Sequence, residues 1–294
     1  MFIDSFIGFL RVERNCSVHT LRAYANDIGV FRDYLACIDG SLSFLDVDAD
    51  VVRSWVASLM DEGAAPASVA RKMSALRSFY GYLRTEGYVV SNPVSLVKGP
   101  KRRKRLPVFV REDEMDSLLD KRSFGEGYGA CRDRMIMMCF YSVGLRLSEL
   151  VGLDVCDVDM GQSVIKVLGK RGKHRVVPFG AEMKKELENY LEQRLAMRGC
   201  DALFLSSSGR RVSRSLVYRM VRDCLGDVTK LAKRSPHVLR HSFATAMLNN
   251  DAELGAVKEL LGHERLATTE VYTHLTFEEL KRFYNKAHPR AGSD

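Results

Sequence analysis

The sequence predicts a mainly α-helical protein of two domains, with a small antiparallel β-sheet in the second domain. Apolar residues recur at helical spacing through the first 98 residues. The segment "VKGPKRRKRLPVF", with its prolines, glycine and basic run, then interrupts that pattern. Further on, the β-rich runs "VIKVL" and "HRVVPF" flank the turn "GKRGK", which indicates a hairpin.

Bulk composition is typical of a soluble protein of one large or two smaller domains. The chain has 294 residues, of which 46% are hydrophobic and 28% charged. No apolar run reaches the length of a membrane span, and the N-terminus indicates an amphipathic helix and not a signal peptide. The seven cysteines are scattered without a C-x-x-C pair. We therefore expect a reducing, cytoplasmic location, no disulfide framework and no zinc ribbon.

The positive charge is unevenly distributed. The formal net charge is +8, yet residues 1–98 carry 10 Lys/Arg against 11 Asp/Glu. Residues 99–108 contain five basic residues and no acidic one, and residues 109–294 carry 30 basic against 26 acidic residues. This bias favours a polyanionic partner, although a plain solvated surface would explain it too.

Residues 1–98 predict a compact bundle of four helices. An apolar stripe occupies residues 2–10, and Ser17 is placed to cap the next helix. Asp48 or Asp50 would cap the third helix, which runs through Trp55. The fourth begins at the proline of "PASVARKMSALRSFYGYLRTEG" and ends at Gly87.

Basic residues of the fourth helix and the linker are candidate DNA contacts. We expect one DNA-facing side on the bundle and a strap near phosphates, because neutralised phosphates supply much of non-specific affinity. A solvated helix face, a plain hinge or a nuclear-localisation signal would account for the same residues. The candidates are Arg71, Lys72, Arg77, Lys101, Arg102 and Arg103.

Residues 109–294 predict a mixed α/β domain. A short helix from Glu112 precedes a longer one through "CRDRMIMMCFYSVG" and then "GLRLSELVGL". After the sheet, helices are expected at 181–197, 214–229, 237–249, 253–261 and 266–273, and "TFEELKRFYNKA" forms a final amphipathic segment.

Two motifs hold arginines that need an anionic partner. "HVLRHSFATAMLNN" places His237, Arg240 and His241 on one helical surface, where they could bind zinc, pack in a core or recognise an anion. In "GLRLSEL", Arg146 lies between leucines, and its partner is either Glu149 at i+3 or a phosphate.

The stretch "HERLATTEVYTHL" contains one tyrosine, Tyr272. Read alone, Tyr272 is a packed aromatic residue. Its meaning changes with the order of the motifs that precede it: an arginine, a lysine in a hairpin turn, H-x-x-R-H, and then L-G-H nine residues before the tyrosine. With these motifs and the helical first hundred residues, nearly the whole chain resembles the tyrosine recombinases of the phage integrase family, and among them the Xer-type site-specific recombinases.

The resemblance implies the fold and the site. It implies a four-helix, SAM-like core-binding domain at 1–98, a basic linker at 99–108 and a mixed α/β tyrosine-recombinase catalytic domain at 109–294. The family pattern places a nucleophile at Tyr272 and surrounds the phosphate with other catalytic residues, without metal or other cofactor. Lys173 is close enough to be confused with the lysine in that set, because the turn departs from the common Gly-Lys-Gly-Asn-Lys. The surrounding residues are Arg146, Lys170, His237, Arg240 and His263.

The resemblance also implies partners. Double-stranded DNA would be held in a tetrameric complex, with or without a sister recombinase, and C-terminal segments would dock on neighbouring protomers. Leu280 and Phe283, with Phe277, form a suitable apolar stripe, unless they fold back on their own domain. The expected role is resolution of chromosome dimers, in chromosome partition and cell division. A mobile-element integrase, a decayed DNA-binding protein and a relaxing topoisomerase are the alternatives.

Overall fold

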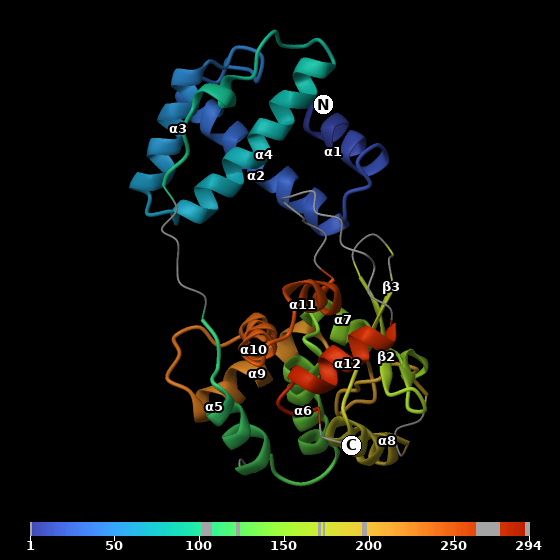
Figure 1. The fold of residues 1–294 in the computed structure, drawn as a ribbon. Helices are drawn as coiled ribbons and strands as arrows, with labels where there is room; N and C mark the ends of the chain where they lie inside the picture. The colour runs from blue at the N-terminus through green and yellow to red at the C-terminus, as the bar shows by residue number, and fades with distance from the viewer. Residues whose placement is uncertain are drawn as a thin grey trace. The chain divides into compact units, whose positions relative to one another are not determined.

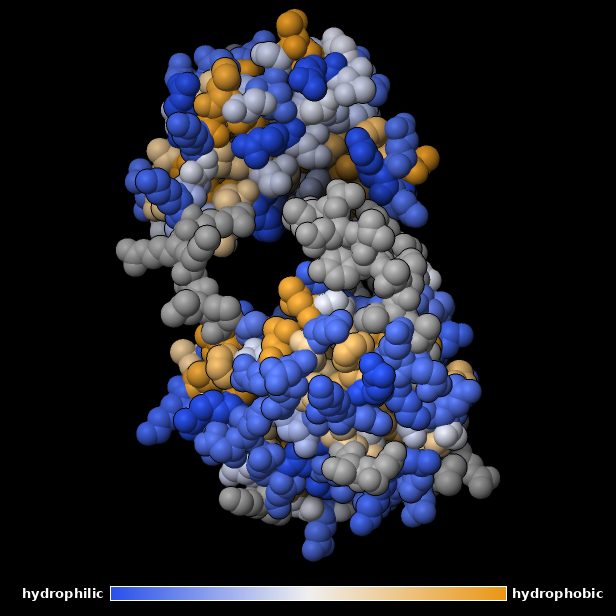
Figure 2. All heavy atoms as spheres, viewed as in Figure 1, coloured by the Kyte–Doolittle hydropathy of each residue, from blue (hydrophilic) through white to orange (hydrophobic). Residues whose placement is uncertain are grey.

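The structure is a computed structural model that describes residues 2–101, 108–121, 124–169, 172, 174–195, 199–262 and 277–291. The chain forms two compact units, Met1–Arg105 and Leu106–Asp294 (Figure 1). On the face shown in Figure 2, hydrophilic residues cover most of the surface and apolar residues form small separate patches. Within the described ranges, no helix is both long and apolar enough to cross a membrane.

The first unit contains the four predicted helices. They are α1 (Phe2–Val12), α2 (Val18–Ile38), α3 (Ala49–Asp61) and α4 (Pro66–Thr85), followed by a 3-10 turn at Pro93–Leu96. The Ser17 hydroxyl accepts a hydrogen bond from the Thr20 amide at 3.3 Å and caps α2. Asp48, and not Asp50, caps α3, because its carboxylate accepts from the amides of Asp50 and Val51 at 2.9 Å.

Aromatic side chains fill the core of this unit. The rings of Phe31 and Trp55 lie 4.8 Å apart between centroids, and those of Phe6 and Phe79 lie 5.4 Å apart, both edge to face. These four side chains are buried. Contacts of this geometry add to the free energy gained by burying the rings, so the bundle has its own core.

The candidate DNA contacts of α4 already have partners inside the unit. Asp27 is buried and forms ion pairs with Arg71 and Lys72, the second at 3.5 Å. Arg77 donates to the Val94 carbonyl at 3.4 Å. The Arg71 side chain stays half exposed and Lys101 is exposed, whereas Arg102 and Arg103 lie outside the described residues. Their contact with DNA stays a prediction.

The second unit is helical around a small sheet, as predicted. Its helical segments before the sheet are α5 (Glu112–Asp116), η2 (Ser117–Lys121), α6 (Tyr128–Met138), η3 (Cys139–Val143), α7 (Leu147–Gly152) and η4 (Val155–Asp157). After the sheet come α8 (Ala181–Leu195), α9 (Arg214–Val228), α10 (Pro236–Asn249), α11 (Leu254–Leu261) and α12 (Phe277–Ala287). The helix predicted at 266–273 lies outside the described residues.

The sheet is antiparallel, with strand order β1 (Val158–Asp159), β2 (Val164–Leu168) and β3 (His174–Pro178). In register, Ile165 pairs with Val177 and Val167 pairs with Arg175. The three aliphatic members of these pairs are buried. Because residues paired across a sheet share a face, Arg175 is directed to the buried side of the hairpin.

The C-terminal helix packs on its own unit. Leu280 and Tyr284 are buried, and Phe283 is partly buried against the same core. This is the fold-back alternative for the apolar stripe; the Phe277 side chain lies outside the described part. Truncation from residue 276 would uncover this core, so impaired synapsis after such a truncation would not report on docking to a neighbour.

The residues after α12 fasten the end of the described chain. The guanidinium of Arg290 pairs with the carboxylates of Asp116 (3.0 Å), Asp120 (2.5 Å) and Glu182. The buried ring of His288 stacks on Tyr284, with ring centroids 5.1 Å apart. Its Nδ1 accepts from the Arg290 amide at 3.1 Å, so its Nε2 carries the proton and donates to the Tyr141 carbonyl at 3.2 Å.

Burial lowers the pKa of His288 to about 4 from its ordinary value near 6.5; the hydrogen bond to the Tyr141 carbonyl opposes this shift, and the charge of Arg290 adds to it. Between these values the unfolded chain binds a proton that the folded chain does not, so stability falls as the pH falls. Between pH 6.5 and 4, titration of His288 should lower the free energy of unfolding by up to about 3 kcal/mol, and His288→Gln should remove this decrease. Urea unfolding at several pH values measures it. Parallel curves for the two proteins would show that His288 does not titrate as described.

Candidate active site

Arg146 lies at the start of α7 and pairs with Glu149. The Arg146 amide donates to Glu149 Oε2 at 2.8 Å, and its Nη1 donates to Oε1 at 2.6 Å. The Glu149 side chain is only 4% exposed, whereas that of Arg146 is 32% exposed. The i+3 pair expected from the sequence therefore forms, and the outer part of the guanidinium still reaches solvent.

Arg175 reaches the same carboxylate from β3. Its Nη1 and Nη2 donate to Glu149 Oε1 and Oε2, each at 2.9 Å, which is a two-bond, planar ion pair. Its Nε donates to the Leu260 carbonyl at 2.9 Å. The sheet is thereby tied to α7 and to the end of α11.

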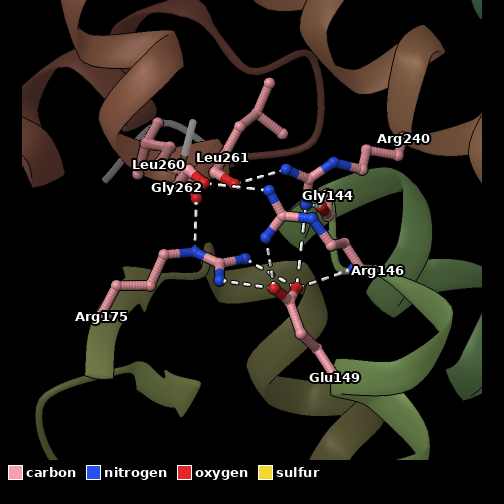
Figure 3. Close-up of polar contacts among 8 residues, drawn as sticks. All are labelled: Gly144, Arg146, Glu149, Arg175, Arg240, Leu260, Leu261 and Gly262. Atoms are coloured by element: carbon pink, nitrogen blue, oxygen red, sulfur yellow. Dashed lines mark hydrogen bonds and ion pairs between the residues drawn. The ribbon is translucent and has the colours of Figure 1, made fainter. Parts of the chain in front are cut away.

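Arg240 enters from α10 and is 7% exposed. Its Nη1 donates to the Gly144 carbonyl at 2.5 Å and lies 3.8 Å from Glu149 Oε2, and its Nη2 donates to the Leu261 carbonyl. Arg146, Glu149, Arg175 and Arg240 thus form one group, hereafter the arginine cluster (Figure 3).

The end of α11 supplies one carbonyl to each arginine of the cluster. Leu260 accepts from Arg175, Leu261 from Arg240, and Gly262 from Arg146 at 2.9 Å (Figure 3). The last carbonyls of a helix have no partner within the helix and carry its negative dipole end. The C-terminus of α11 is therefore a docking point for cations.

Two glycines in left-handed backbone conformations shape the carbonyls of the site. Gly262 ends α11 with φ at +62°, and Gly144 precedes Arg146 with φ at +64°. A Cβ on Gly144 would lie 2.6 Å from a ring carbon of Phe243, and one on Gly262 would lie 3.2 Å from Cδ of Arg175. Any other residue would clash with Phe243 at Gly144, and at Gly262 it would be strained by the positive φ.

The cluster has more positive than negative charge. Burial alone would raise the pKa of Glu149, but hydrogen bonds and charge from Arg175, followed by Arg146, lower it to about 2. Burial, then repulsion from Arg146 and Arg175, lowers the pKa of Arg240, against the attraction of Glu149. Three guanidiniums share one carboxylate, so an added anion would relieve this repulsion.

His237 lies in the first turn of α10 and is exposed. It precedes Arg240 by three residues and so shares a side of the helix with it. Because His237 is exposed, the interpretation that its side chain packs in the core is wrong. Within the described ranges, no group of three or more His, Cys, Asp or Glu side chains could hold a metal ion. Lys170, Lys173, His263 and Tyr272 lie outside the described residues.

The motifs did not identify Arg175 as a site residue. They also did not show that three arginines share Glu149. A signal for Arg175 did exist. In "HRVVP" the arginine shares the period-2 face of the strand with Val177, so a charge is directed to the buried side and needs a partner. The identity of that partner depends on how α7 and α11 meet β3.

Two family profiles match the chain. The phage integrase family matches residues 108–279, and the N-terminal SAM-like domain of phage integrases matches residues 3–87. The family expected from the motifs is thus confirmed.

Curated relatives match over nearly the full length. The chain is 38% identical to tyrosine recombinase XerC of Chlorobaculum tepidum, over 99% of this chain and 95% of that protein. It is 35% identical to tyrosine recombinase XerD of Staphylococcus epidermidis, over 98% and 99%. The fold matches XerH bound to its difH substrate with a TM-score of 0.70, at 22% identity over 95% of this chain and 83% of that one. The chain therefore belongs to the phage integrase family, and it is a site-specific tyrosine recombinase of the Xer type.

Glu149 should contribute to stability only while it is ionised. Because its pKa is lowered in the folded state, this contribution is complete above about pH 4.5 and is lost as the pH falls toward 2. Glu149→Gln should lower the free energy of unfolding at pH 7 by about 3 kcal/mol, and this deficit should shrink below pH 4.5. Urea unfolding measures both effects. The exposed Glu188→Gln on α8 is the matched control and should change stability by less than about 0.5 kcal/mol. A deficit that does not change with pH would contradict the ionic origin.

Proposed function

We propose that this recombinase cleaves and rejoins double-stranded DNA through a 3′-phosphotyrosine intermediate on Tyr272. The observation that carries the proposal is the arginine cluster. Arg146 and Arg240 come from separate elements and meet at the end of α11. The single negative charge of Glu149 does not balance the positive charges of the cluster. A scissile phosphate supplies the missing anion.

The reaction conserves the phosphodiester energy by two transesterifications. The Tyr272 oxygen attacks the phosphorus, the bond to the 5′ oxygen breaks, and a 5′-hydroxyl leaves. The 5′-hydroxyl of an exchanged strand then attacks the phosphotyrosine and releases the tyrosine. Arg146 and Arg240 stabilise the negative charge on the nonbridging oxygens in both transition states, as metal ions do in many nucleases.

The remaining predicted residues handle protons and hydrogen bonds. A free tyrosine has a pKa of about 10, so its proton needs an acceptor. His237 accepts that proton or hydrogen-bonds the phosphate, and its exposure at the start of α10 leaves it open to a substrate. Lys170 protonates the departing 5′ oxygen, and His263 donates a further hydrogen bond. No cofactor enters these steps.

The assembly follows from the chemistry, because strand exchange needs two DNA sites. Arg71, Lys72 and Arg77 on α4 and the linker residues 101–103 would contact DNA phosphates. We infer a tetramer on two sites, supported by a fold match to a lambda integrase tetramer bound to a Holliday junction. That match has a TM-score of 0.68 at 19% identity, over 92% of this chain and 79% of that one.

We further propose that the biological role is resolution of chromosome dimers in the cytoplasm, alone or with a sister recombinase. Relatives named XerC and XerD over nearly the whole chain support this role. All seven cysteines are free, which fits a reducing compartment. Integration of a mobile element by the same chemistry is the alternative.

Tyr272→Phe should abolish the covalent protein–DNA adduct on a nicked suicide substrate, because the substitution removes the attacking oxygen. Denaturing gel electrophoresis detects the adduct formed by the wild-type protein. Tyr218→Phe, at an exposed tyrosine of α9, is the matched control and should retain it. Adduct formed by Tyr272→Phe would disprove the assignment of the nucleophile. Strand cleavage that occurs without a covalent adduct, stops in EDTA and returns with magnesium would instead indicate a metal nuclease.

The chromosomal role predicts recombination between two directly repeated dif-like sites on a plasmid. We expect deletion of the intervening DNA, with the sister recombinase present if one is required. Product size on a gel measures this outcome. Relaxation of supercoils without deletion would favour a topoisomerase, and exchange only at the ends of a mobile element would favour an integrase.

A further inference from the structure

We propose that Arg175 is a positioning residue for strand cleavage, because it remains the counter-ion of Glu149 when Arg146 turns to the phosphate. The inference rests on the proposed function of Arg146 as a phosphate-binding residue. It assigns to the hairpin arginine a role distinct from phosphate contact, general acid catalysis or folding alone.

The bonds of Arg175 are directed into the protein. Two of its nitrogens hold both oxygens of Glu149, and the third holds the Leu260 carbonyl. Its side chain is 13% exposed, less than half the value for Arg146. Pairing with Val167 fixes its backbone in the sheet. A guanidinium held by three such bonds is poorly placed to leave for a ligand.

Arg146 is held more loosely. Its guanidinium uses one nitrogen for Glu149 and one for the Gly262 carbonyl. Its backbone amide also donates to Glu149, and that bond does not depend on where the guanidinium lies. The side chain can therefore turn outward while α7 keeps its N-terminal cap.

The buried Glu149 carboxylate links these two arginines. When the Arg146 guanidinium leaves for a phosphate, Glu149 keeps the two bonds from Arg175 and the bond from the Arg146 amide. Without Arg175, the Arg146 guanidinium becomes the main counter-ion of the buried Glu149 carboxylate. Moving Arg146 to a phosphate would then remove that counter-ion, which is costly. Loss of Arg175 should therefore slow the chemical step more than it weakens DNA binding.

The test compares single-turnover cleavage of a nicked suicide substrate with DNA affinity from fluorescence anisotropy. Arg175→Gln should slow adduct formation by about 100-fold at saturating protein, with affinity changed less than about threefold. Arg175→Lys keeps the charge without the fork and should fall between this variant and the wild type. Arg222→Gln, at an exposed arginine on α9, is the matched control and should cleave at the wild-type rate.

Two further measurements separate the proposed role from a general structural one. First, Glu149→Gln combined with Arg175→Gln should cleave faster than Arg175→Gln alone, because a neutral side chain no longer retains Arg146. Second, the effect of Arg175→Gln should shrink on a methylphosphonate substrate, because this substrate lacks the negative charge of the phosphate that Arg146 would neutralise. The effect should persist on a 5′-phosphorothiolate substrate, whose leaving group needs no acid.

Each contrary result overturns the inference. Equal losses of affinity and rate would mean that Arg175 itself contacts DNA. Full rescue by the phosphorothiolate would mean that it acts through Lys170. Additive losses in the double variant would mean that it only maintains the fold, which thermal melting of each variant would also reveal. Failure of the wild-type protein to form any adduct would instead reject the proposed function, so the two failures are distinguishable.

Discussion

In the second unit, the buried carboxylate of Glu149 connects several elements of the site. It closes the N-terminus of α7, accepts two bonds from β3 through Arg175, and lies 3.8 Å from the Arg240 guanidinium of α10. Burial makes each of these bonds stronger and makes an unpaired charge costly. Elements that are distant in the sequence are thereby held together by one ionised group.

The end of α11 completes this arrangement. Its three terminal carbonyls each accept from a different arginine, so a helix end that would otherwise need water or a capping side chain is satisfied. These acceptors in turn hold the three arginines close to one another despite their mutual repulsion. Arg175 and Arg240 are held by buried acceptors, whereas the more exposed Arg146 guanidinium is the one that can turn toward an added anion. The left-handed turns at Gly144 and Gly262 make this close approach possible.

The C-terminal tail is held by a second cluster of charged residues, in which negative charges outnumber positive ones. Arg290 meets three carboxylates, and although burial alone would lower its pKa, these carboxylates raise it. With Tyr284 and His288 buried beneath, the tail fastens α12 to α5, η2 and α8 of the same unit. An apolar stripe in a C-terminal helix is therefore compatible with a core role, and its pattern alone does not distinguish that role from docking on a neighbour.

Local sequence determined the elements and the chemistry they carry. Periodicity, caps such as Ser17 and Asp48, and the hairpin around "GKRGK" are set by residues near one another, so the helices, the sheet and the motif order could be predicted. The sequence also placed Arg146, His237 and Arg240 among the candidate site residues. Only the tertiary structure decided that Glu149 is shared, that Arg175 joins the cluster, and that α12 packs in cis. Each of these depends on which distant elements meet, and packing across the whole unit, not local pattern, fixes those encounters.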